Sequence, residues 1–290
     1  MEHRINGHTR LFCLIGSPVG HSGSPAMYNY SFDKLGLDNA YLAFDIPLEK
    51  TGEAVQALKL MHVGGFNVTM PCKTAVTDFV DEVSPAAQMI GACNTVTVSE
   101  SGRLTGHNTD GIGFVRNLEK HGVSVKGKKL VVLGAGGAAT AVTIQSALEG
   151  AAKISIFNRK GFNFYEKGEH TVETVKAKLP ECDISIHNLF DDRLLAEAVN
   201  DCDILINATK VGMAPLDKET LINPALFRPE MVVADTVYNP RETRMIREAK
   251  AAGCTVVGGI GMLLQQGVAA FKLFTGEQMP EKEVMQKFFS

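Results

Sequence analysis

This 290-residue chain carries a lysine and an aspartate in two polar segments, each at the end of a predicted strand. Together the two side chains could transfer a proton. In "NVTMPCK", Pro71 ends an extended apolar run and directs Thr69 and Lys73 toward the carboxyl edge of the strand, where open α/β sheets bind ligands. Asp110 follows in "GHNTDG". A lysine and a carboxylate that lie together form one coupled pair for general acid-base catalysis. Taken singly, the lysine could be merely solvated and the aspartate a turn or cap residue.

The stretch "GSPVGHSGSPAMYN" crowds hydroxyl side chains between a predicted strand and a predicted helix. Either Ser22 or Ser24 can cap the helix, which leaves the other serine to bind a polyol or a carboxylate. Asn94, in "GACNTV", adds a side-chain amide to this half of the chain. The serines therefore indicate a site for a hydroxylated or acidic small molecule.

A glycine-rich turn lies between an apolar strand and a helix in "VVLGAGGAATAV". Gly134, Gly136 and Ala139 have the spacing G-x-G-x-x-A, which permits a tight turn, close approach of a pyrophosphate and close helix packing. In its strand-helix-strand context the pattern indicates a dinucleotide site, although the glycines could serve a tight turn alone.

The tip of the next strand reads "FNRKG", where NAD-specific sites carry an acidic residue. Asn158, Arg159 and Lys160 instead offer amide and cationic donors, which suit the 2′-phosphate of NADP. The alternative is a solvated basic turn.

The elements that must position these side chains alternate along the first third of the chain. Apolar β-prone runs predict strands at 10–16, 40–46 and 64–70, and helical spacing predicts helices at 24–37, 48–61 and 73–83. The β-branched run at 93–108, broken by "SESG", predicts an antiparallel hairpin, so the first domain should contain a mixed sheet.

The second half alternates more strictly, which predicts a parallel sheet covered by helices on both faces. Its predicted strands lie at 129–136, 153–158, 203–209, 231–237 and 254–259. A last helix at 261–276 follows directly and could return to the first domain, which would make that domain discontinuous.

Composition and charge limit the kinds of molecule that the chain could bind and the compartment in which it could lie. The net charge of −3, with no basic block, argues against nucleic acid. The N-terminus lacks the apolar core of a signal peptide, and no run approaches the roughly 18 apolar residues of a membrane span, so we expect a cytoplasmic protein. No metal is expected, because no spacing of His or Cys residues suits a zinc site and the cysteines are interpreted as reduced residues of the core. They are Cys13, Cys72, Cys93, Cys182, Cys202 and Cys254.

In chain order, "GSPVGHSGSPAMYN", "FNVTMPCK", "GACNT", "GHNTDG", "GAGGAA", "NATKVGM", "VYNP" and "GMLLQQG" resemble the motifs of the shikimate dehydrogenase family over nearly the whole chain. "IFNRKGFNFYEK" resembles its quinate/shikimate dehydrogenase branch. The resemblance implies an α/β fold: a mixed-sheet substrate domain (1–110 plus 260–290) and a Rossmann-type dinucleotide-binding domain (111–259), with a deep cleft between them. It implies reversible NAD(P)-dependent reduction of 3-dehydroshikimate to shikimate in the biosynthesis of chorismate and aromatic amino acids.

Motif matching also implies residue roles. Lys73 and Asp110 fall on the catalytic pair. The implied substrate-binding residues are Ser22, Ser24, Thr69, Asn94, Tyr238 and Gln266. The implied cofactor-binding residues are Gly134, Ala135, Gly136, Gly137, Ala138, Asn158, Arg159, Lys160, Lys210 and Gly259. The quinate/shikimate branch commonly has an acid shortly after its Asn-Arg pair, where this chain has Gly161, so NADP and NAD both stay open as cofactors.

Two rival functions stay open. One is a catabolic dehydrogenase that acts mainly on quinate or on another cyclic acid such as an amino-shikimate. The other is a non-catalytic protein that senses shikimate or quinate, against which the presence of both Lys73 and Asp110 argues. In each case the expected partner is a small molecule, and the chain is expected to be a monomer or a homodimer.

Overall fold

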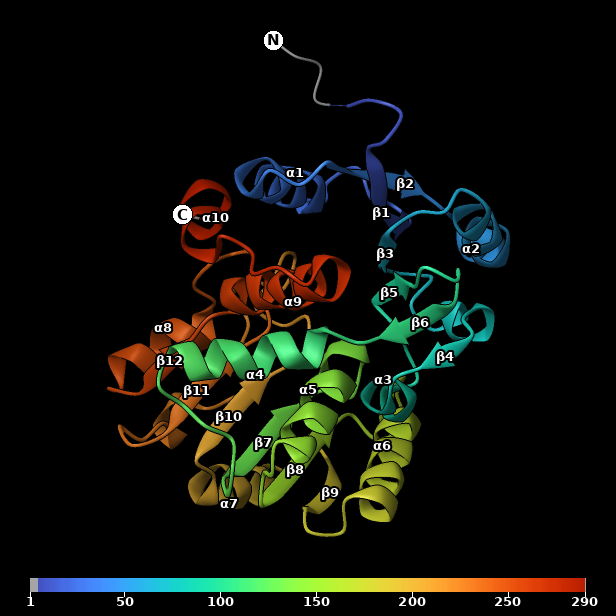
Figure 1. Ribbon diagram of the computed structural model, residues 1–290. Helices are drawn as coiled ribbons and strands as arrows, with labels where there is room; N and C mark the ends of the chain where they lie inside the picture. The colour runs from blue at the N-terminus through green and yellow to red at the C-terminus, as the bar shows by residue number, and fades with distance from the viewer. Residues whose placement is uncertain (1–4, 290) are drawn as a thin grey trace. The chain divides into compact units, whose positions relative to one another are not determined.

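The computed structural model of the protein describes residues 5–289, and the described chain forms two compact units. Unit 1 contains the described residues up to Thr109 and those from Gly267 onward, and unit 2 contains Asp110–Gln266. Each unit is built on one six-stranded sheet, and Figure 1 labels the strands and helices of both.

The sheet of unit 1 is mixed and has the strand order β2-β1-β3-β5-β6-β4. Strand β1 pairs in parallel with β2 and β3, whereas β5 is antiparallel to β3 and to β6, as the predicted hairpin requires. The bounds are β1 (Arg10–Gly16), β2 (Asn39–Asp45), β3 (Gly65–Val68), β4 (Glu82–Val83), β5 (Thr95–Val98) and β6 (Leu104–His107).

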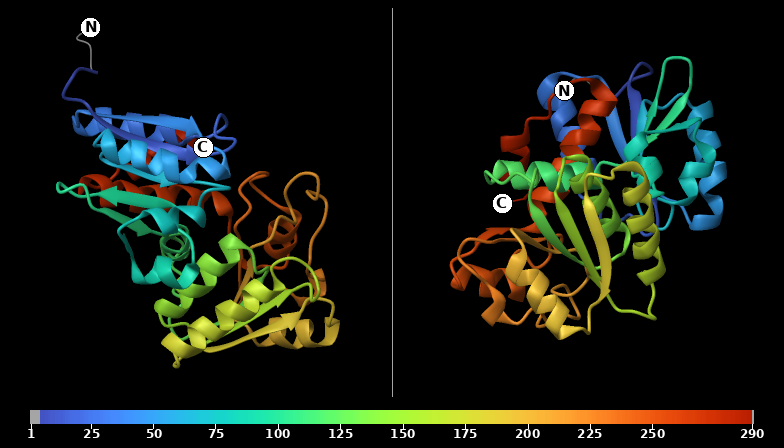
Figure 2. Two further views of the ribbon diagram at one scale, coloured as in Figure 1. Left: turned by 90° about the vertical axis from the view of Figure 1, so that its right-hand side faces the viewer. Right: turned by 90° about the horizontal axis from the view of Figure 1, so that it is seen from below.

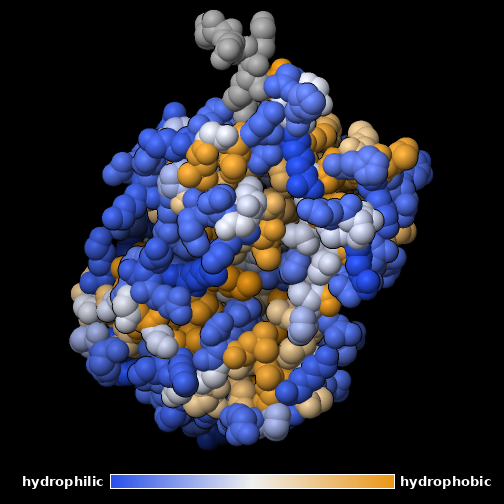
Figure 3. All heavy atoms as spheres, in the orientation of Figure 1, coloured by the Kyte–Doolittle hydropathy of each residue, from blue (hydrophilic) through white to orange (hydrophobic). Residues whose placement is uncertain are grey.

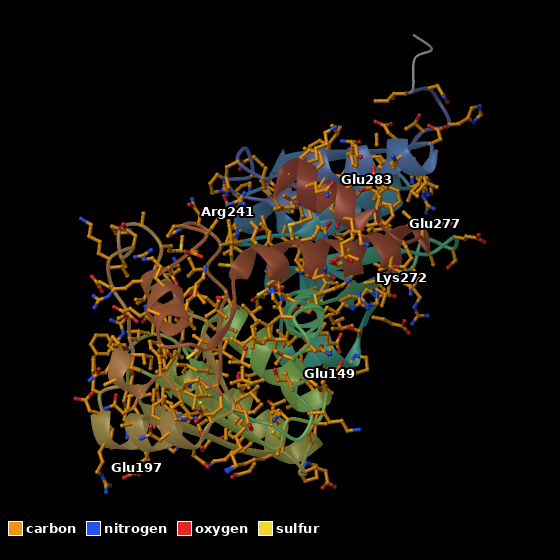
Figure 4. The ribbon with its side chains drawn as sticks, turned by 90° about the vertical axis from the view of Figure 1, so that its left-hand side faces the viewer. Glu149, Glu197, Arg241, Lys272, Glu277 and Glu283 are labelled. Atoms are coloured by element: carbon orange, nitrogen blue, oxygen red, sulfur yellow. The ribbon has the colours of Figure 1, made fainter. Side chains whose placement is uncertain are left out.

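Helices lie on both faces of this sheet, because side chains along β1 alternate between the two. Phe12 joins an aromatic cluster in which Tyr28 stacks on Tyr41 with ring centroids 4.4 Å apart, whereas Cys13 and Ile15 join an aliphatic core on the other face. The helices of unit 1 are α1 (Ser24–Leu35), α2 (Thr51–Leu60), α3 (Pro85–Ile90), part of α9 (Gly259–Thr275) and α10 (Glu281–Phe288), with short 3-10 turns η1 (Leu48–Lys50) and η2 (Ala75–Phe79). Glu283 of α10, labelled in Figure 4, accepts a hydrogen bond from Tyr30 of α1 at 2.7 Å.

The helix predicted at 73–83 is wrong. Only the five residues of η2 are helical there, and the segment then continues into the short strand β4. The backbone N–H of Asp81 donates to Leu104 O at 3.0 Å, and the Asp81 carboxylate accepts from Leu104 N at 2.8 Å. Pairing with β6 therefore replaces the local helix that the apolar spacing favoured, a tertiary contact that outweighs propensity.

The sheet of unit 2 is entirely parallel, in the order β12-β11-β10-β7-β8-β9. This is the doubly wound Rossmann order with β7 as its first strand, and it confirms the predicted fold class. The strands are β7 (Lys129–Leu133), β8 (Lys153–Asn158), β9 (Asp183–Asn188), β10 (Ile204–Asn207), β11 (Val232–Asp235) and β12 (Thr255–Val257). Sequence reasoning missed β9, whose "DISIHN" mixes apolar and polar residues at the edge of the sheet.

Helices cover both faces of the parallel sheet in unit 2. Figure 2 shows α6 on the side opposite to α7 and α8, and residues of α7 and α8 pack with Val131, Leu205 and Val233 in one apolar core. Besides the start of α9, the helices are α4 (Asp110–Lys120), α5 (Gly137–Leu148), α6 (Tyr165–Lys178), α7 (Asp192–Asp201) and α8 (Arg244–Ala251), with the short turn η3 (Pro224–Leu226).

The second boundary between the units falls inside one continuous helix. The sequence placed the change at 259/260, directly after the first residue of α9, whereas the units divide between Gln266 and Gly267 of α9. Phe274, in the later part of α9, packs on Phe12 of β1 with ring centroids 5.3 Å apart, which ties this part of the helix to unit 1. Which unit binds substrate and which binds cofactor stays a proposal.

The surface mixes residue types. Hydrophobic residues are interspersed with hydrophilic ones over the face drawn in Figure 3. Among residues 5–289, no helix combines the length and the apolar character that crossing a membrane requires.

Candidate active site

The segment that carries Thr69 and Lys73 is held at the carboxyl end of β3 by backbone hydrogen bonds. Thr69 N donates to Ile15 O at 2.9 Å, and Cys93 N donates to Lys73 O at 2.8 Å. Val68 N also donates to Asn94 O at 2.8 Å. The structure therefore brings Thr69, Lys73 and Asn94 to one edge of the sheet of unit 1.

The first strand can reach this segment only because it ends in a glycine. Gly16 has φ +148°, and a Cβ at this position would lie 2.4 Å from Thr69 Cγ2 and 2.8 Å from Met70 O. Ser17 N, the next residue, donates to Met70 O at 2.9 Å. The loop after β1, which leads to Ser22 and Ser24, thus starts beside Thr69.

The two serines differ in what they contact. Ser22 Oγ accepts from Ser24 N at 3.2 Å, just before α1, so its own hydroxyl proton remains available for donation. Both serines are half-buried, and the helix cap itself, Gly23, makes no side-chain bond. Ser22 thus accepts one backbone N–H at the start of the helix without occupying the cap position. Both hydroxyls stay candidates for binding a ligand.

Asn94 is part of a buried hydrogen-bond network. Its Oδ1 accepts from Thr109 N at 2.8 Å and from Thr95 Oγ1 at 3.0 Å, and its Nδ2 donates to Thr109 Oγ1 at 3.0 Å. Asn67 Nδ2 donates to Thr95 Oγ1 at 3.0 Å, and Tyr41 donates to Asn67 Oδ1 at 2.7 Å. Burial raises the pKa of Tyr41 well above its ordinary value, which keeps its phenol a donor. Asn94 therefore fixes the residue directly before α4.

Helix α4 begins at Asp110 and approaches two other helices of unit 2 through glycines. A Cβ at Gly111 would lie 2.5 Å from Ala141 O of α5, and one at Gly113 would lie 2.6 Å from Gln266 N of α9. Such separations are far below van der Waals contact, so only glycine fits at either position. The first turn of α4 is thus held between α5 and α9, beside Gln266.

We expect Gly113→Ala to destabilise the protein by about 1 to 3 kcal/mol, because the added methyl group overpacks the contact between α4 and α9. Activity should fall as well, because the displaced helix begins at Asp110. Urea unfolding and steady-state rates measure both effects. Gly7→Ala is the matched control, since nothing lies within 4 Å of a Cβ at Gly7. Wild-type stability in Gly113→Ala would contradict the packing described here.

In unit 2, the predicted dinucleotide turn connects β7 to α5. Gly134 lies in the left-handed region with φ +107°, where an added Cβ would be 2.9 Å from Ala208 O. Gly134 N donates to Phe157 O at 2.8 Å, which ties the turn to the end of β8. Glycine is therefore required here by conformation and by space.

The residues after Gly134 leave open space at the start of α5. A Cβ at Gly136 or Gly137 would meet nothing within 4 Å, and Ala138 is exposed. Ala139, the small third residue of the motif, is buried at 1% exposure where the helix packs on the sheet. The first turn of α5 contains no acidic residue. An open helix N-terminus of this kind binds anions, so these residues fit a pyrophosphate.

The basic tip of β8 lies beside this turn. Arg159 and Lys160 are exposed, and Lys160 N donates to Asn188 Oδ1 at 3.3 Å. The guanidinium of Arg159 lies 5.0 Å from the ring centroid of Phe162, a cation–π contact that orients it. At Gly161 no carboxylate is present to compete with a 2′-phosphate for Arg159.

Two further predicted cofactor residues, Lys210 and Gly259, and the predicted substrate residue Tyr238 lie after the neighbouring strands of the same sheet. Lys210 is exposed in the loop after β10, Tyr238 is 48% exposed in the loop after β11, and Gly259 starts α9 after β12. Because the strands are parallel, these loops share the carboxyl edge with Gly134 and Asn158. Unit 2 thus gathers all the predicted cofactor positions on one edge.

Two buried polar residues at this edge were not singled out from the sequence: Asn207 and Asp235, 3% and 2% exposed, the last residues of β10 and β11. The pattern in the sequence that could have identified them is a polar residue at the end of an apolar strand. Burial raises the pKa of Asp235 from 3.8 to about 6, although hydrogen bonds from Thr243, from the Val237 N–H and from Asn207 oppose the shift.

The raised pKa of Asp235 predicts a pH dependence of stability. Between pH 3.8 and about 6 the unfolded chain loses this proton while the folded chain keeps it, so stability falls as the pH rises. The total contribution is about 3 kcal/mol, fully present below the unfolded pKa. We expect the unfolding free energy of the wild type, relative to Asp235→Asn, to fall by about 2 kcal/mol between pH 4.5 and 7.5. A difference independent of pH would show that the carboxyl titrates normally.

The described residues contain no group of three or more His, Cys, Asp or Glu side chains arranged to hold a metal ion.

Comparison with known proteins gives one consistent family. The model of the shikimate dehydrogenase substrate binding domain matches residues 14–96, and that of the shikimate 5'-dehydrogenase C-terminal domain matches residues 259–287. A shikimate dehydrogenase (NADP(+)) from Listeria monocytogenes serotype 4b (strain F2365) is 45% identical over 290 residues, covering 100% of this chain and 99% of that protein.

Solved structures agree with this result. A shikimate 5-dehydrogenase from Listeria monocytogenes, in complex with shikimate and NAD, superposes with a TM-score of 0.97 at 43% identity, covering 100% of this chain and 99% of the other. A quinate dehydrogenase from Corynebacterium glutamicum, in complex with NAD, gives a TM-score of 0.86 at 28% identity, covering 97% of this chain and 98% of the other.

Proposed function

Because the chain belongs to the shikimate dehydrogenase family, we propose that it catalyses the reversible NAD(P)-dependent reduction of 3-dehydroshikimate to shikimate, on the route to chorismate and the aromatic amino acids. The observation that carries this proposal is similarity over the whole chain, 45% in sequence and a TM-score of 0.97 in structure. The nicotinamide supplies or accepts the hydride. The residues of this chain bind and orient the substrate and exchange the proton with it.

Proton transfer is assigned to Lys73 and Asp110. Reduction of the ketone at C3 generates an alkoxide, which needs a proton within hydrogen-bond reach. Lys73, held by its carbonyl at the end of β3, donates that proton and takes it back in the oxidation. Asp110, the first residue of α4, forms a coupled pair with it. A protein that only sensed shikimate or quinate would not need such a pair.

Hydroxyl and amide side chains are proposed to hold the substrate. Ser22 lies just before α1 and Ser24 is its first residue, and both suit a carboxylate because hydroxyl groups donate to it. Gln266 and Tyr238 are proposed to contribute from unit 2. Asn94 already donates to Thr109 and accepts from two residues, so its main contribution is to hold the chain before Asp110 in place.

Both nicotinamide cofactors fit the proposal, with NADP favoured. The relative with 45% identity is named for NADP(+), and the Listeria structure contains NAD. Arg159 and Lys160 supply positive charge where a 2′-phosphate would lie, and Gly161 supplies no opposing carboxylate.

Initial rates test this function and separate it from its closest rival. Shikimate and quinate are each assayed with NADP and NAD, and the reduced nicotinamide is followed by absorbance. We expect turnover of shikimate with NADP at least, whereas turnover of quinate alone would favour the quinate dehydrogenase reading suggested by the Corynebacterium relative. Absence of turnover with every pair would refute the proposal.

The cytoplasm is the proposed location, supported by six unbridged cysteines that are all buried. A monomer or a homodimer is the proposed assembly.

A further inference from the structure

Three loops at the carboxyl edge of unit 2 carry residues proposed to lie beside the cofactor or the substrate. The loop after β10 carries Lys210, the loop after β11 carries Tyr238, and the connection after β12 leads to Gly259. The family resemblance assigns no residue to holding these three loops in one arrangement, although the motif "NATKVGM" begins at Asn207.

The Asn207 side chain organises the first loop. Its Oδ1 accepts from Thr209 N at 3.1 Å and from Thr209 Oγ1 at 2.7 Å. Its Nδ2 donates to Val211 O at 2.9 Å and to Asp235 Oδ1 at 3.0 Å. The amide thus makes four hydrogen bonds, its full capacity, and the backbone on both sides of Lys210 is wrapped around it.

The Asp235 side chain organises the second loop. Its Oδ1 accepts from Val237 N at 2.9 Å, next to Tyr238, and its Oδ2 accepts from Thr243 Oγ1 at 2.6 Å. Thr243 in turn caps α8, because its Oγ1 accepts from Ile246 N at 3.3 Å. The carboxylate therefore fixes both ends of the loop 236–243, in which Figure 4 labels Arg241.

The third connection packs directly on the backbone that Asp235 holds. A Cβ at Gly259 would lie 2.5 Å from Val237 O and 2.6 Å from Thr236 O. The first loop also touches the end of the second, since a Cβ at Gly212 would lie 2.9 Å from Thr243 Cγ2. All three segments thus meet around the Asn207 and Asp235 side chains, which are register partners in β10 and β11.

A buried carboxylate is costly unless its oxygens are satisfied, so its presence calls for a reason. Asp235 takes part in none of the ion pairs found among residues 5–289, and its donors are neutral. What a carboxylate offers here is two acceptor oxygens that serve three donors from three segments. An amide would offer one acceptor oxygen, and its N–H₂ would face the Thr243 hydroxyl.

We propose that Asp235 and Asn207 are positioning residues that hold the loops of Lys210, Tyr238 and Gly259 together and thereby build the binding surface for the nicotinamide half of the cofactor. This inference rests on the proposed function. The adenine half is expected to depend instead on the glycine turn after β7 and the tip of β8, two strands that lie on the other side of β10 from β11 and β12.

Two probes separate these halves: NADP⁺, and 2′,5′-ADP, which lacks the nicotinamide half. Both are titrated by calorimetry at pH 7.5 without substrate, into the wild type, Asp235→Asn and Thr243→Val. The matched controls change the same residue types elsewhere in unit 2. Asp203→Asn alters a carboxylate at the amino end of β10 that accepts from Lys129 N at 2.8 Å, and Thr171→Val removes a buried hydroxyl that bonds to Lys167 O within α6.

We expect Asp235→Asn and Thr243→Val to weaken NADP⁺ binding by about tenfold and to leave 2′,5′-ADP binding within about twofold of the wild type. The controls should change neither. Amide hydrogen exchange of residues 209–217 and 236–243 should accelerate in both variants, with residues 134–160 unchanged. Should Asp235→Asn fail to fold, Thr243→Val decides, because it keeps the carboxylate and removes one of its three donors.

Equal losses of both probes, or no loss of NADP⁺ affinity in either variant, would overturn the positioning role and leave the proposed function standing. If the wild type binds neither probe, the proposed function fails and the inference fails with it.

Discussion

Replacing Lys73 with alanine is expected to lower kcat by about 10² to 10⁴, the usual contribution of general acid-base catalysis. In the proposed mechanism, the proton that Lys73 exchanges is needed only as the alkoxide forms, so the effect should appear in kcat, with a much smaller change in KM for shikimate. Steady-state rates over a range of shikimate concentrations measure both effects.

Lys59→Ala is the matched control for this variant. Lys59 also belongs to unit 1, but its ammonium group pairs with Asp81 at 3.1 Å on the surface of the protein. Removing such an exposed surface pair should change stability little and leave kcat unchanged. If Lys73→Ala kept the wild-type kcat and only raised KM, Lys73 would be a substrate anchor, and the proton would have to come from Asp110 or from water.

Replacing Arg159 with alanine should weaken NADP binding by about 1.5 to 3 kcal/mol and leave NAD binding nearly unchanged. The guanidinium is exposed at the tip of β8 and oriented by the ring of Phe162, and the 2′-phosphate is the group by which the two cofactors differ. The ratio of kcat/KM for NADP to that for NAD, measured in the wild type and the variant, gives the size of the effect.

Lys129→Ala controls for the loss of a positive charge from unit 2. Lys129 starts β7 at the opposite edge of the sheet and pairs with Asp201 at 2.7 Å, so neither cofactor should be affected. Equal losses of NADP and NAD in Arg159→Ala would instead indicate contact with the adenine, and no loss would identify Arg159 as part of a solvated turn.

The fold was predictable wherever local patterns and tertiary contacts agree. The buried strands of unit 2 are continuous apolar runs, and the turns between β5 and β6 and between β7 and α5 have typical turn residues. The errors lie where an edge strand decides the structure. Strand β9 is paired only with β8 and has a mixed sequence, and residues 82–83 become a strand because β6 is available to pair with them.

The candidate site was predictable to the extent that each residue stands at the end of a strand. Thr69, Lys73 and the residues of the glycine turn could be found because proline and glycine mark these ends in the sequence. Asn207 and Asp235 each close an apolar run, in "DILINAT" and "MVVADTV", but these patterns do not reveal that the two polar residues are register partners. The roles of these residues in catalysis and binding stay predictions, and the Lys73 and Asp235 variants test two of them.

The transfer of a labelled hydride tests the central claim most directly. Shikimate deuterated at C3 is incubated with the protein and NADP⁺, and the nicotinamide product is examined by mass spectrometry. Our account predicts reduced cofactor one mass unit heavier than that formed from unlabelled shikimate, together with 3-dehydroshikimate that contains no label. Absence of reduced cofactor, or reduced cofactor without deuterium, would contradict the assignment of this chain as a dehydrogenase that acts at C3 of shikimate.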